Sequence, residues 1–120
     1  MNENHRSKIV IDTNILRYLI RYKRSLTELL TELLVTRALI SEFCFEELRS
    51  QVPASIVVEL QKVCEIHQTT SEGDGSVIEL AARYKVPVLT NDQALQKQLR
   101  QANLRVFAIS LRGRRIREAL

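Results

Sequence analysis

Three aspartates stand where their carboxylates could act together. Asp12 and Asp92 each follow a short apolar run that is typical of a buried strand, and Asp74 lies in a loop that leads into a helix. In an open parallel sheet, ligands bind beyond the carboxyl ends of the strands, where the strand order reverses. If the strands before Asp12 and Asp92 are neighbours there, we expect the three carboxylates to lie within about one metal-ion coordination sphere. Glu47, in a predicted helix, could join them from a side wall.

Such a group of acids indicates a hard divalent cation. Carboxylates that share a cleft repel one another, and oxygen ligands select Mg²⁺ or Mn²⁺ over softer metals. Metals held in this way activate water and stabilise the leaving oxygen in phosphodiester hydrolysis. A second interpretation stays open, because aspartates before helices commonly cap exposed amides and a helical glutamate is commonly a solvated charge. The two interpretations are compatible, since a capping carboxylate can also orient a ligand.

The charge of the chain favours an acidic partner. The formal net charge is +4, and six arginines from Arg100 onward face a single acid in that segment, Glu118. Guanidinium groups bind phosphate oxygens in a forked geometry, so Arg112, Arg114 and Arg115 are predicted to bind a nucleic-acid backbone. The alternative is a solvated tail that serves only solubility.

The apolar pattern alternates between strands and helices along the chain. Short runs with β-branched residues predict strands at 8–11, 37–40, 63–68, 86–89 and 105–109. Helical periodicity and capping residues predict helices at 13–22, 25–35, 43–50, 54–63, 77–85 and 92–102. This alternation indicates parallel βαβ units with right-handed crossovers. We therefore expect an α/β fold, a three-layer α/β/α sandwich whose mostly parallel sheet has about five strands.

The second predicted helix carries a stripe of leucines at helical spacing, which we expect to belong mainly to the core: Leu26, Leu29, Leu30, Leu33 and Leu34. A 120-residue α/β sandwich leaves some helical apolar surface uncovered. We therefore expect a homodimer.

The overall composition is that of a single globular domain. Residues 1–120 are expected to form it, with a polar N-terminal extension at 1–7 and a basic C-terminal tail at 111–120. No apolar run approaches the roughly 20 residues that span a bilayer, and the start MNENHRSK is polar, so we expect a cytoplasmic protein with no membrane partner. Cys44 and Cys64 have no metal-ligand spacing and are predicted to be buried hydrophobes.

Four segments, KIVIDTN, the EEL of FCFEELRS, GDGSVIELA and VPVLTND, occur in this order and together resemble the PIN domain of metal-dependent ribonucleases. The resemblance extends from Lys8 to about Leu111. It implies an endoribonuclease that hydrolyses RNA with bound Mg²⁺ or Mn²⁺, and the metal-binding and catalytic acids that it implies are Asp12, Glu47, Asp74 and Asp92. By the same resemblance, Thr90 would orient a site carboxylate and Asn14 would brace the loop after the first strand.

Two positions need a choice within this resemblance. Glu47 is assigned rather than Glu46, because the family's acid directly precedes a leucine on the helix. Relatives often carry a second acid directly after the third aspartate; Gly75 stands there in this chain, and Glu72 is the alternative.

The resemblance also bears on partners. The ending VFAISLRGRR resembles PIN proteins related to ribosomal-RNA cleavage factors, and the chain also resembles VapC-type toxins, which cleave RNA and are held inactive by an antitoxin. The implied partners are RNA and either an antitoxin or an RNA-processing protein. Two other classes stay open: a non-catalytic RNA-binding or adaptor module with this fold, and a flavodoxin-like phosphoacceptor domain. Four intact acids argue against the first, and the missing adjacent acids and lysine of a receiver argue against the second.

Overall fold

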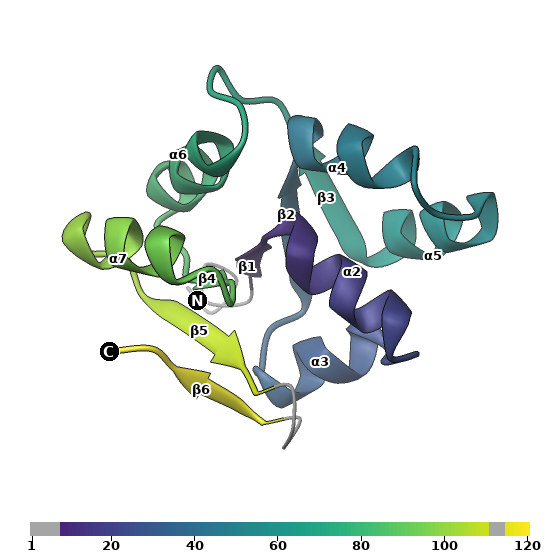
Figure 1. Ribbon diagram of the computed structural model, residues 1–120, viewed down its shortest axis with the longest axis horizontal. Helices are drawn as coiled ribbons and strands as arrows, with labels where there is room; N and C mark the ends of the chain where they lie inside the picture. The colour runs from purple at the N-terminus through teal and green to yellow at the C-terminus, as the bar shows by residue number, and fades with distance from the viewer. Residues whose placement is uncertain (1–7, 111–114) are drawn as a thin grey trace.

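The computed structural model describes residues 8–110 and 115–120. In these ranges strands and helices alternate, as Figure 1 shows. The strands are β1 (Lys8–Ile11), β2 (Arg37–Ser41), β3 (Cys64–His67), β4 (Val88–Leu89), β5 (Val106–Ile109) and β6 (Ile116–Glu118). The helices are α2 (Thr13–Arg21), α3 (Leu26–Glu32), α4 (Glu42–Arg49), α5 (Ala54–Val63), α6 (Asp74–Tyr84) and α7 (Gln93–Gln101).

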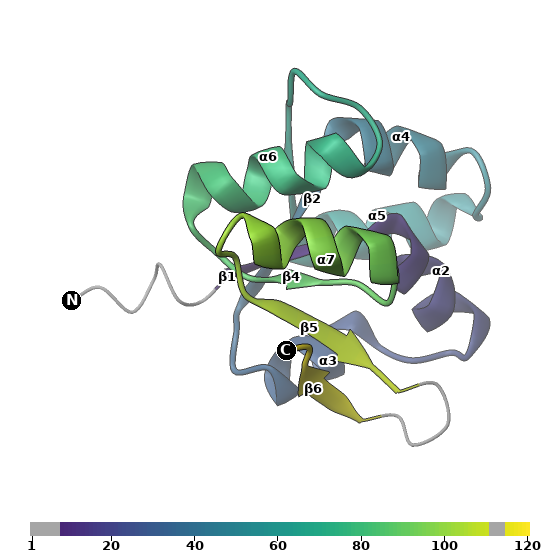
Figure 2. The same ribbon diagram turned by 60° about the vertical axis from the view of Figure 1, so that its left-hand side comes forward.

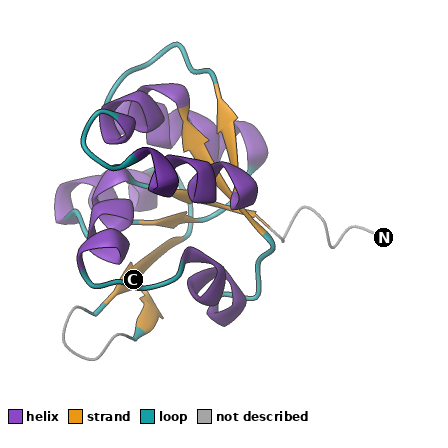
Figure 3. Cartoon of the chain, turned by 90° about the vertical axis from the view of Figure 1, so that its right-hand side faces the viewer, coloured by secondary structure: helices purple, strands orange, loops and turns teal. Residues whose placement is uncertain are grey.

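One sheet forms the middle layer, with its strands in the order β3-β2-β1-β4-β5-β6. Strands β1 to β5 are parallel to their neighbours, and β6 is antiparallel to β5. Helices α6 and α7 cover one face of the sheet, and α2 to α5 lie on the other (Figures 1 and 2). Figure 3 shows the strands enclosed between the helices. The predicted α/β class with a mostly parallel sheet is confirmed.

The strand order reverses between β1 and β4. From β1 the chain continues outward to β2 and β3, and then returns to the other side of β1 for β4 and β5. Ile11, the last residue of β1, pairs with Leu89, the last residue of β4. Flavodoxin-like domains have the order 2-1-3-4-5, so the order 3-2-1-4-5 found here excludes the phosphoacceptor interpretation.

The sheet has a sixth strand that the sequence does not predict. Residues 116–118, expected to be part of a basic tail, form β6, and Ile116 pairs with Ile109 across the β5–β6 ladder. The Arg105 guanidinium donates to both carboxylate oxygens of Glu118, at 3.0 and 2.9 Å. A strand of three residues with two charges has too little apolar alternation to be recognised, because its partner strand supplies most of its stabilisation.

The first leucines of the stripe belong to the core, and the last one is exposed. Leu26, Leu29 and Leu30 are buried, and Ser25 caps the helix by accepting from the Glu28 amide at 3.3 Å. Leu34 is 88% exposed, so its assignment to the core is wrong. The reason is local: α3 ends at Glu32, and Leu34 has a φ of +60°, a left-handed conformation common just after helices that turns the next residues away.

The central strands are buried except at their first residues, Lys8 and Arg37. Their fully buried residues are Ile9, Val10, Ile11, Ala38, Leu39, Ile40, Val88 and Leu89. Cys44 and Cys64 are buried free thiols, as predicted, and burial raises the pKa of Cys64 to about 12. Within residues 8–110 and 115–120, no helix is long and apolar enough to cross a membrane.

Replacing Leu29 with alanine should lower the free energy of unfolding by about 2–5 kcal/mol, because truncation of this fully buried side chain leaves a cavity. Leu34→Ala is the matched control from the same stripe. Because Leu34 is exposed, its truncation should change stability by less than about 0.5 kcal/mol. Urea unfolding followed by circular dichroism measures both, and equal losses would contradict the placement of Leu34 outside the core.

Candidate active site

Asp12 and Asp92 lie in the connections that follow β1 and β4, where the strand order reverses. Asp12 directly follows β1 and is only 7% exposed, and Asp92 is the third residue after the end of β4. Each is also a helix cap: Asp12 Oδ1 accepts from the Asn14 amide at 3.3 Å, and Asp92 Oδ1 accepts from the Leu95 amide at 3.0 Å. The capping interpretation is therefore correct for both residues. Each cap uses one carboxylate oxygen, so capping does not remove these side chains from a shared site.

Thr90 links these two acids. Its Oγ1 donates a hydrogen bond of 2.7 Å to Asp12 Oδ2 and accepts one of 3.1 Å from the Asp92 backbone amide. The side chain is fully buried. Both oxygens of Asp12 thus accept a hydrogen bond, one from the Asn14 backbone amide and one from the Thr90 hydroxyl. That Thr90 orients a site carboxylate and that Asn14 braces the loop after the first strand stay predictions.

Asp74 reaches the same region from the start of α6, which covers the same face of the sheet as α7, the helix that Asp92 caps. It is the first residue of α6, and the cap position is taken by Gly73 with a φ of +58°, so Asp74 makes no capping bond of its own and that interpretation is wrong here. Partial burial raises the pKa of Asp74, and the negative charges of Asp92 and Asp12 raise it further. The three aspartates therefore interact electrostatically across the sheet edge.

A cavity of about 340 Å³ collects three of the four predicted acids: Asp12, Glu47 and Asp74. Glu47 reaches it from α4, with a side chain that is 46% exposed and 3.8 Å from an Arg17 nitrogen. Asp92 does not line this acid cavity, although its charge acts on Asp74. Within residues 8–110 and 115–120, no three carboxylate, histidine or cysteine side chains stand close enough to hold a metal. The expectation of one coordination sphere is therefore not met in this state.

The alternatives to Glu47 do not line the acid cavity. Glu46 pairs with Arg49 at 3.3 Å and lines an adjacent groove with Glu42 and Glu72, and Glu47 lines both this groove and the acid cavity. A Cβ added at Gly75 would stand 3.0 Å from the Ser71 Cβ, so a second acid after Asp74 would require the preceding loop to shift.

Two residues that line or border this cavity were not predicted from the sequence. Thr13 is buried, and its hydroxyl has no hydrogen-bond partner among the described residues. Arg17 donates to Asn14 Oδ1 and to Gln51 Oε1, both at 2.9 Å, and lies 3.8 Å from Glu47 of α4. Helical spacing was the available signal, because positions 13 and 17 are one turn apart and follow Asp12 on the same helix.

The donor set of the cavity suits a hard divalent cation. It offers carboxylate oxygens from three separate elements and the unsatisfied Thr13 hydroxyl, with no sulfur or imidazole donor lining it apart from the buried Cys44 thiol. Oxygen ligands of this kind are those of Mg²⁺ and Mn²⁺. Buried polar atoms that lack a protein partner are rare, and a bound ion or water molecule often satisfies them.

The loop before Asp74 is held by Glu79, a residue of the helix α6 that follows the loop. Glu79 accepts hydrogen bonds of 3.0 Å from the backbone amides of Thr70 and Ser71, and Arg83 completes the contact at 2.8 Å. The helix start is tied to β2 as well: Ser76 donates to the Gly73 carbonyl at 2.7 Å, and its oxygen lies 2.8 Å from that of buried Ser41. Asp74 is thus placed by hydrogen bonds on both sides.

The basic segment is only partly described. Arg112 and Arg114 lie outside the described residues. Arg115 is exposed, and its carbonyl accepts a hydrogen bond of 2.6 Å from the Ser110 amide. Ser110 directly follows β5, so Arg115 lies at the edge of the sheet that carries the acids. Its role in RNA binding stays a prediction.

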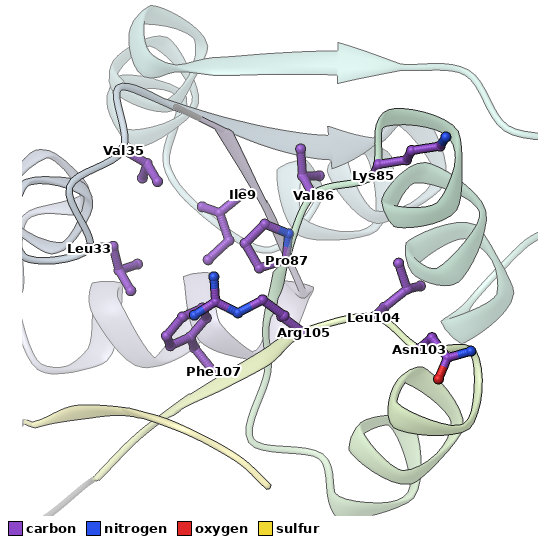
Figure 4. Close-up of a pocket in the computed structure, with 10 residues that line it drawn as sticks. All are labelled: Ile9, Leu33, Val35, Lys85, Val86, Pro87, Asn103, Leu104, Arg105 and Phe107. Carbon is purple, nitrogen blue, oxygen red and sulfur yellow. The ribbon is translucent and has the colours of Figure 1, made fainter. Parts of the chain in front are cut away.

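A larger cavity, of about 620 Å³, lies at the other edge of the sheet (Figure 4). Ile9, Val86 and Pro87 line it near the amino ends of their strands, together with Phe107 and the Arg105 guanidinium, which stands 5.2 Å from the Phe107 ring centre. Since the carboxylates lie beyond the carboxyl ends, this apolar cavity is separate from the acids.

The chain resembles known proteins throughout the region that holds these residues. Residues 9–114 match a family described as PIN like domain. The chain is 32% identical over 106 residues to Ribonuclease VapC9 of Archaeoglobus fulgidus, which covers 81% of this chain and 78% of that relative. The solved PIN domain endonuclease Utp24 is 24% identical, with a TM-score of 0.72 over 92% of this chain and 90% of that one, a likeness of fold.

Thr90→Val keeps the side-chain shape but removes the hydroxyl that serves Asp12 and the Asp92 amide. We expect it to lower the free energy of unfolding by about 1–3 kcal/mol, because a buried carboxylate and an amide lose their partner. Thr90→Ser, which keeps the hydroxyl, is the control and should cost less. Urea unfolding distinguishes them, and a greater loss in the serine variant would assign the effect to methyl packing instead.

Glu79 should make stability depend on pH in the acid range. Its hydrogen bonds to the amides of Thr70 and Ser71 lower its pKa from 4.5 to about 2. A carboxyl group with a lower pKa in the folded state stabilises the fold above its unfolded pKa, and that contribution is lost as the pH falls through the folded pKa.

Glu79→Gln should therefore be less stable than the wild type at pH 7. The difference should shrink as the pH falls from about 4.5 towards about 2, where the wild-type carboxyl becomes neutral as well. Denaturant unfolding at a series of pH values measures this. A difference that stays constant over that range would mean that the amide replacement disturbs packing rather than charge.

Proposed function

Because the chain belongs to the PIN-like domain family, as its sequence motifs predict, we propose that it is a metal-dependent endoribonuclease that hydrolyses RNA phosphodiester bonds. The 32% identical relative is a ribonuclease, which supports a nuclease activity for this chain. The observation that carries the proposal is that Asp12, Glu47 and Asp74 line one cavity at the reversal of strand order, where the charges of Asp92 and Asp12 help to raise the pKa of Asp74.

The acids proposed to hold the metal are Asp12, Glu47, Asp74 and Asp92. Bound there, Mg²⁺ or Mn²⁺ would lower the pKa of a water molecule and neutralise charge on the phosphate. The chain's own residues prepare that site. Thr90 and Asn14 fix the two oxygens of Asp12, and Glu79 fixes the loop before Asp74.

Arg17 completes the proposed arrangement from the rim. Its guanidinium faces Glu47 on one side and remains 39% exposed, so it can meet a phosphate that approaches the acids. The Thr13 hydroxyl, which lacks a partner among the described residues, can donate to an oxygen inside the cavity. The positive charge of Arg17 and the hydroxyl dipole of Thr13 would stabilise an anionic substrate beside the acids, which otherwise repel it.

The proposed partners follow from the same family. RNA is the substrate, and Arg112, Arg114 and Arg115 are proposed to hold phosphates that flank the cut. If this chain acts as a VapC-type toxin, its proposed partner is an antitoxin. If this chain matures RNA, its proposed partner is another RNA-processing protein. A homodimer is proposed from the apolar helical surface.

Asp92→Asn should abolish metal-dependent RNA cleavage while the fold stays intact. An asparagine can still cap α7, but it removes one of the charges that hold the cation. Mn²⁺ at about 100 times its Kd should stabilise the wild type by roughly 2.7 kcal/mol, which raises Tm by several degrees, and the variant should show a smaller rise.

Glu59→Gln is the matched control. Glu59 is an exposed acid on α5 that pairs with Lys62, and neither residue lines the acid cavity. It should cleave RNA and respond to Mn²⁺ like the wild type. Thermal unfolding with and without Mn²⁺ and cleavage of a labelled RNA are the two measurements. Binding of RNA with no cleavage by the wild type at any metal concentration would instead favour a non-catalytic RNA-binding module.

A further inference from the structure

A second cavity lies directly beside the acid cavity. It has a volume of about 280 Å³, and we call it the tyrosine pocket after the two tyrosines of α2 that line it, Tyr18 and Tyr22. Asn14 and Arg17 line both cavities and form the wall between them. A chain molecule bound at the acids therefore has an adjacent place for its next unit.

The aromatic rings of this pocket are arranged as a platform. The Tyr18 and Tyr22 ring centres are 4.7 Å apart with planes tilted by 47°, and the Tyr22 side chain is 46% exposed. The Arg21 guanidinium stands 5.7 Å from the Tyr22 ring centre. An exposed ring flanked by a guanidinium is what unpaired bases stack on, because every base has a π-face.

The polar groups of the pocket also favour a nucleotide. Tyr18 is 8% exposed, and its hydroxyl has no hydrogen-bond partner among the described residues, so a bound oxygen or nitrogen could satisfy it. The charged residues that line the pocket are Arg17 and Arg21, and no acid lines it within the described part of the chain. A phosphate entering here meets the positive charges of Arg17, in the wall shared with the acid cavity, and of Arg21.

The side-chain amide of Asn91 is already engaged on both sides. Asn91 donates to the Ile109 carbonyl and accepts from the Ile109 amide, both at 2.8 Å, and Asn14 Oδ1 accepts from Arg17. Since this leaves mainly the Asn14 Nδ2 group to read a base edge, the pocket should bind chiefly by stacking and charge.

We propose that the tyrosine pocket is a nucleotide subsite that binds one unpaired residue of a single-stranded RNA next to the bond that the acids cut. Tyr22 stacks the base, Arg21 and Arg17 face its phosphates, and Tyr18 closes the floor. That the bound RNA is also cut rests on the proposed function. That the pocket binds single-stranded RNA is independent of it.

The test measures affinity for a labelled single-stranded RNA by fluorescence anisotropy at several salt concentrations. The full chain is used in EDTA, so that the strand is not cut. Tyr22→Leu should weaken binding at least about fivefold with little change in salt dependence, because it removes a stacking surface. Arg21→Ala should weaken binding and reduce the magnitude of the log–log salt slope by about 0.7, the value for one phosphate contact on a single strand.

Two controls match these variants. Tyr22→Phe keeps the ring and should bind like the wild type. Arg100→Ala removes an exposed arginine near the end of α7, at the other edge of the sheet from the acids, and should leave affinity and slope near the wild-type values. Circular dichroism verifies that each variant is folded. We expect the variants at Tyr22 and Arg21 to fold, because both side chains are exposed.

The same variants are then assayed for cleavage with Mn²⁺, which separates this proposal from the preceding one. Wild-type affinity and slope in both Tyr22→Leu and Arg21→Ala overturn the subsite, even if cleavage is normal, and so does a wild type that does not bind RNA. Weakened binding in both variants together with a wild type that never cleaves supports the subsite and counts against the nuclease.

Discussion

The parallel pairing of β1 with β4 is the constraint on which the acid cavity depends. These strands are separated by most of the chain, yet Ile11 and Leu89 end them side by side. The residues that follow, Asp12 and Thr90, are therefore within hydrogen-bond distance, and Thr90 holds Asp12 by a 2.7 Å bond. The buried central strands make this register costly to change, because a one-residue slip would exchange the apolar side chains that pack against the helices of the two faces.

The acids are placed by hydrogen bonds that oppose their mutual repulsion. Asp12 and Asp92 each bond to the first turn of a helix, where the backbone amides favour negative charge. Asp74 has no capping bond, and its raised pKa reflects both its burial and the charges of the other two aspartates. Glu79, which lies outside the cavity, holds the loop in front of Asp74 through two backbone amides. The cluster is thus kept together by neutral donors around it.

Helix α2 connects the acids to the surface beside them. Asp12 caps it, Thr13 and Asn14 form its first turn, and Arg17 reaches across to α4. Further along the chain, Tyr18, Arg21 and Tyr22 line the tyrosine pocket and not the acid cavity. This helix and its two cap residues therefore present a carboxylate, two guanidinium groups and two aromatic rings along one side of the acid cavity.

The sequence by itself determined the α/β class, most helices and strands, the buried cysteines and the order of the acid-bearing segments. Local chemistry decides these features: β-branched runs, helical periodicity, and Ser25, Asp12 and Asp92 as caps. The tertiary structure alone decided which strands are neighbours, that Asp74 interacts with Asp12 and Asp92, and that Asp92 stands beside the acid cavity rather than in it. It also decided that residues 116–118 pair with β5 and that Arg17 lies between two cavities. Each of these depends on contacts between segments distant in the chain, and pairing energies of that kind leave no periodic signal in either segment alone. The exposure of Leu34 has a local cause instead, the end of α3 at Glu32, which the leucine spacing does not show.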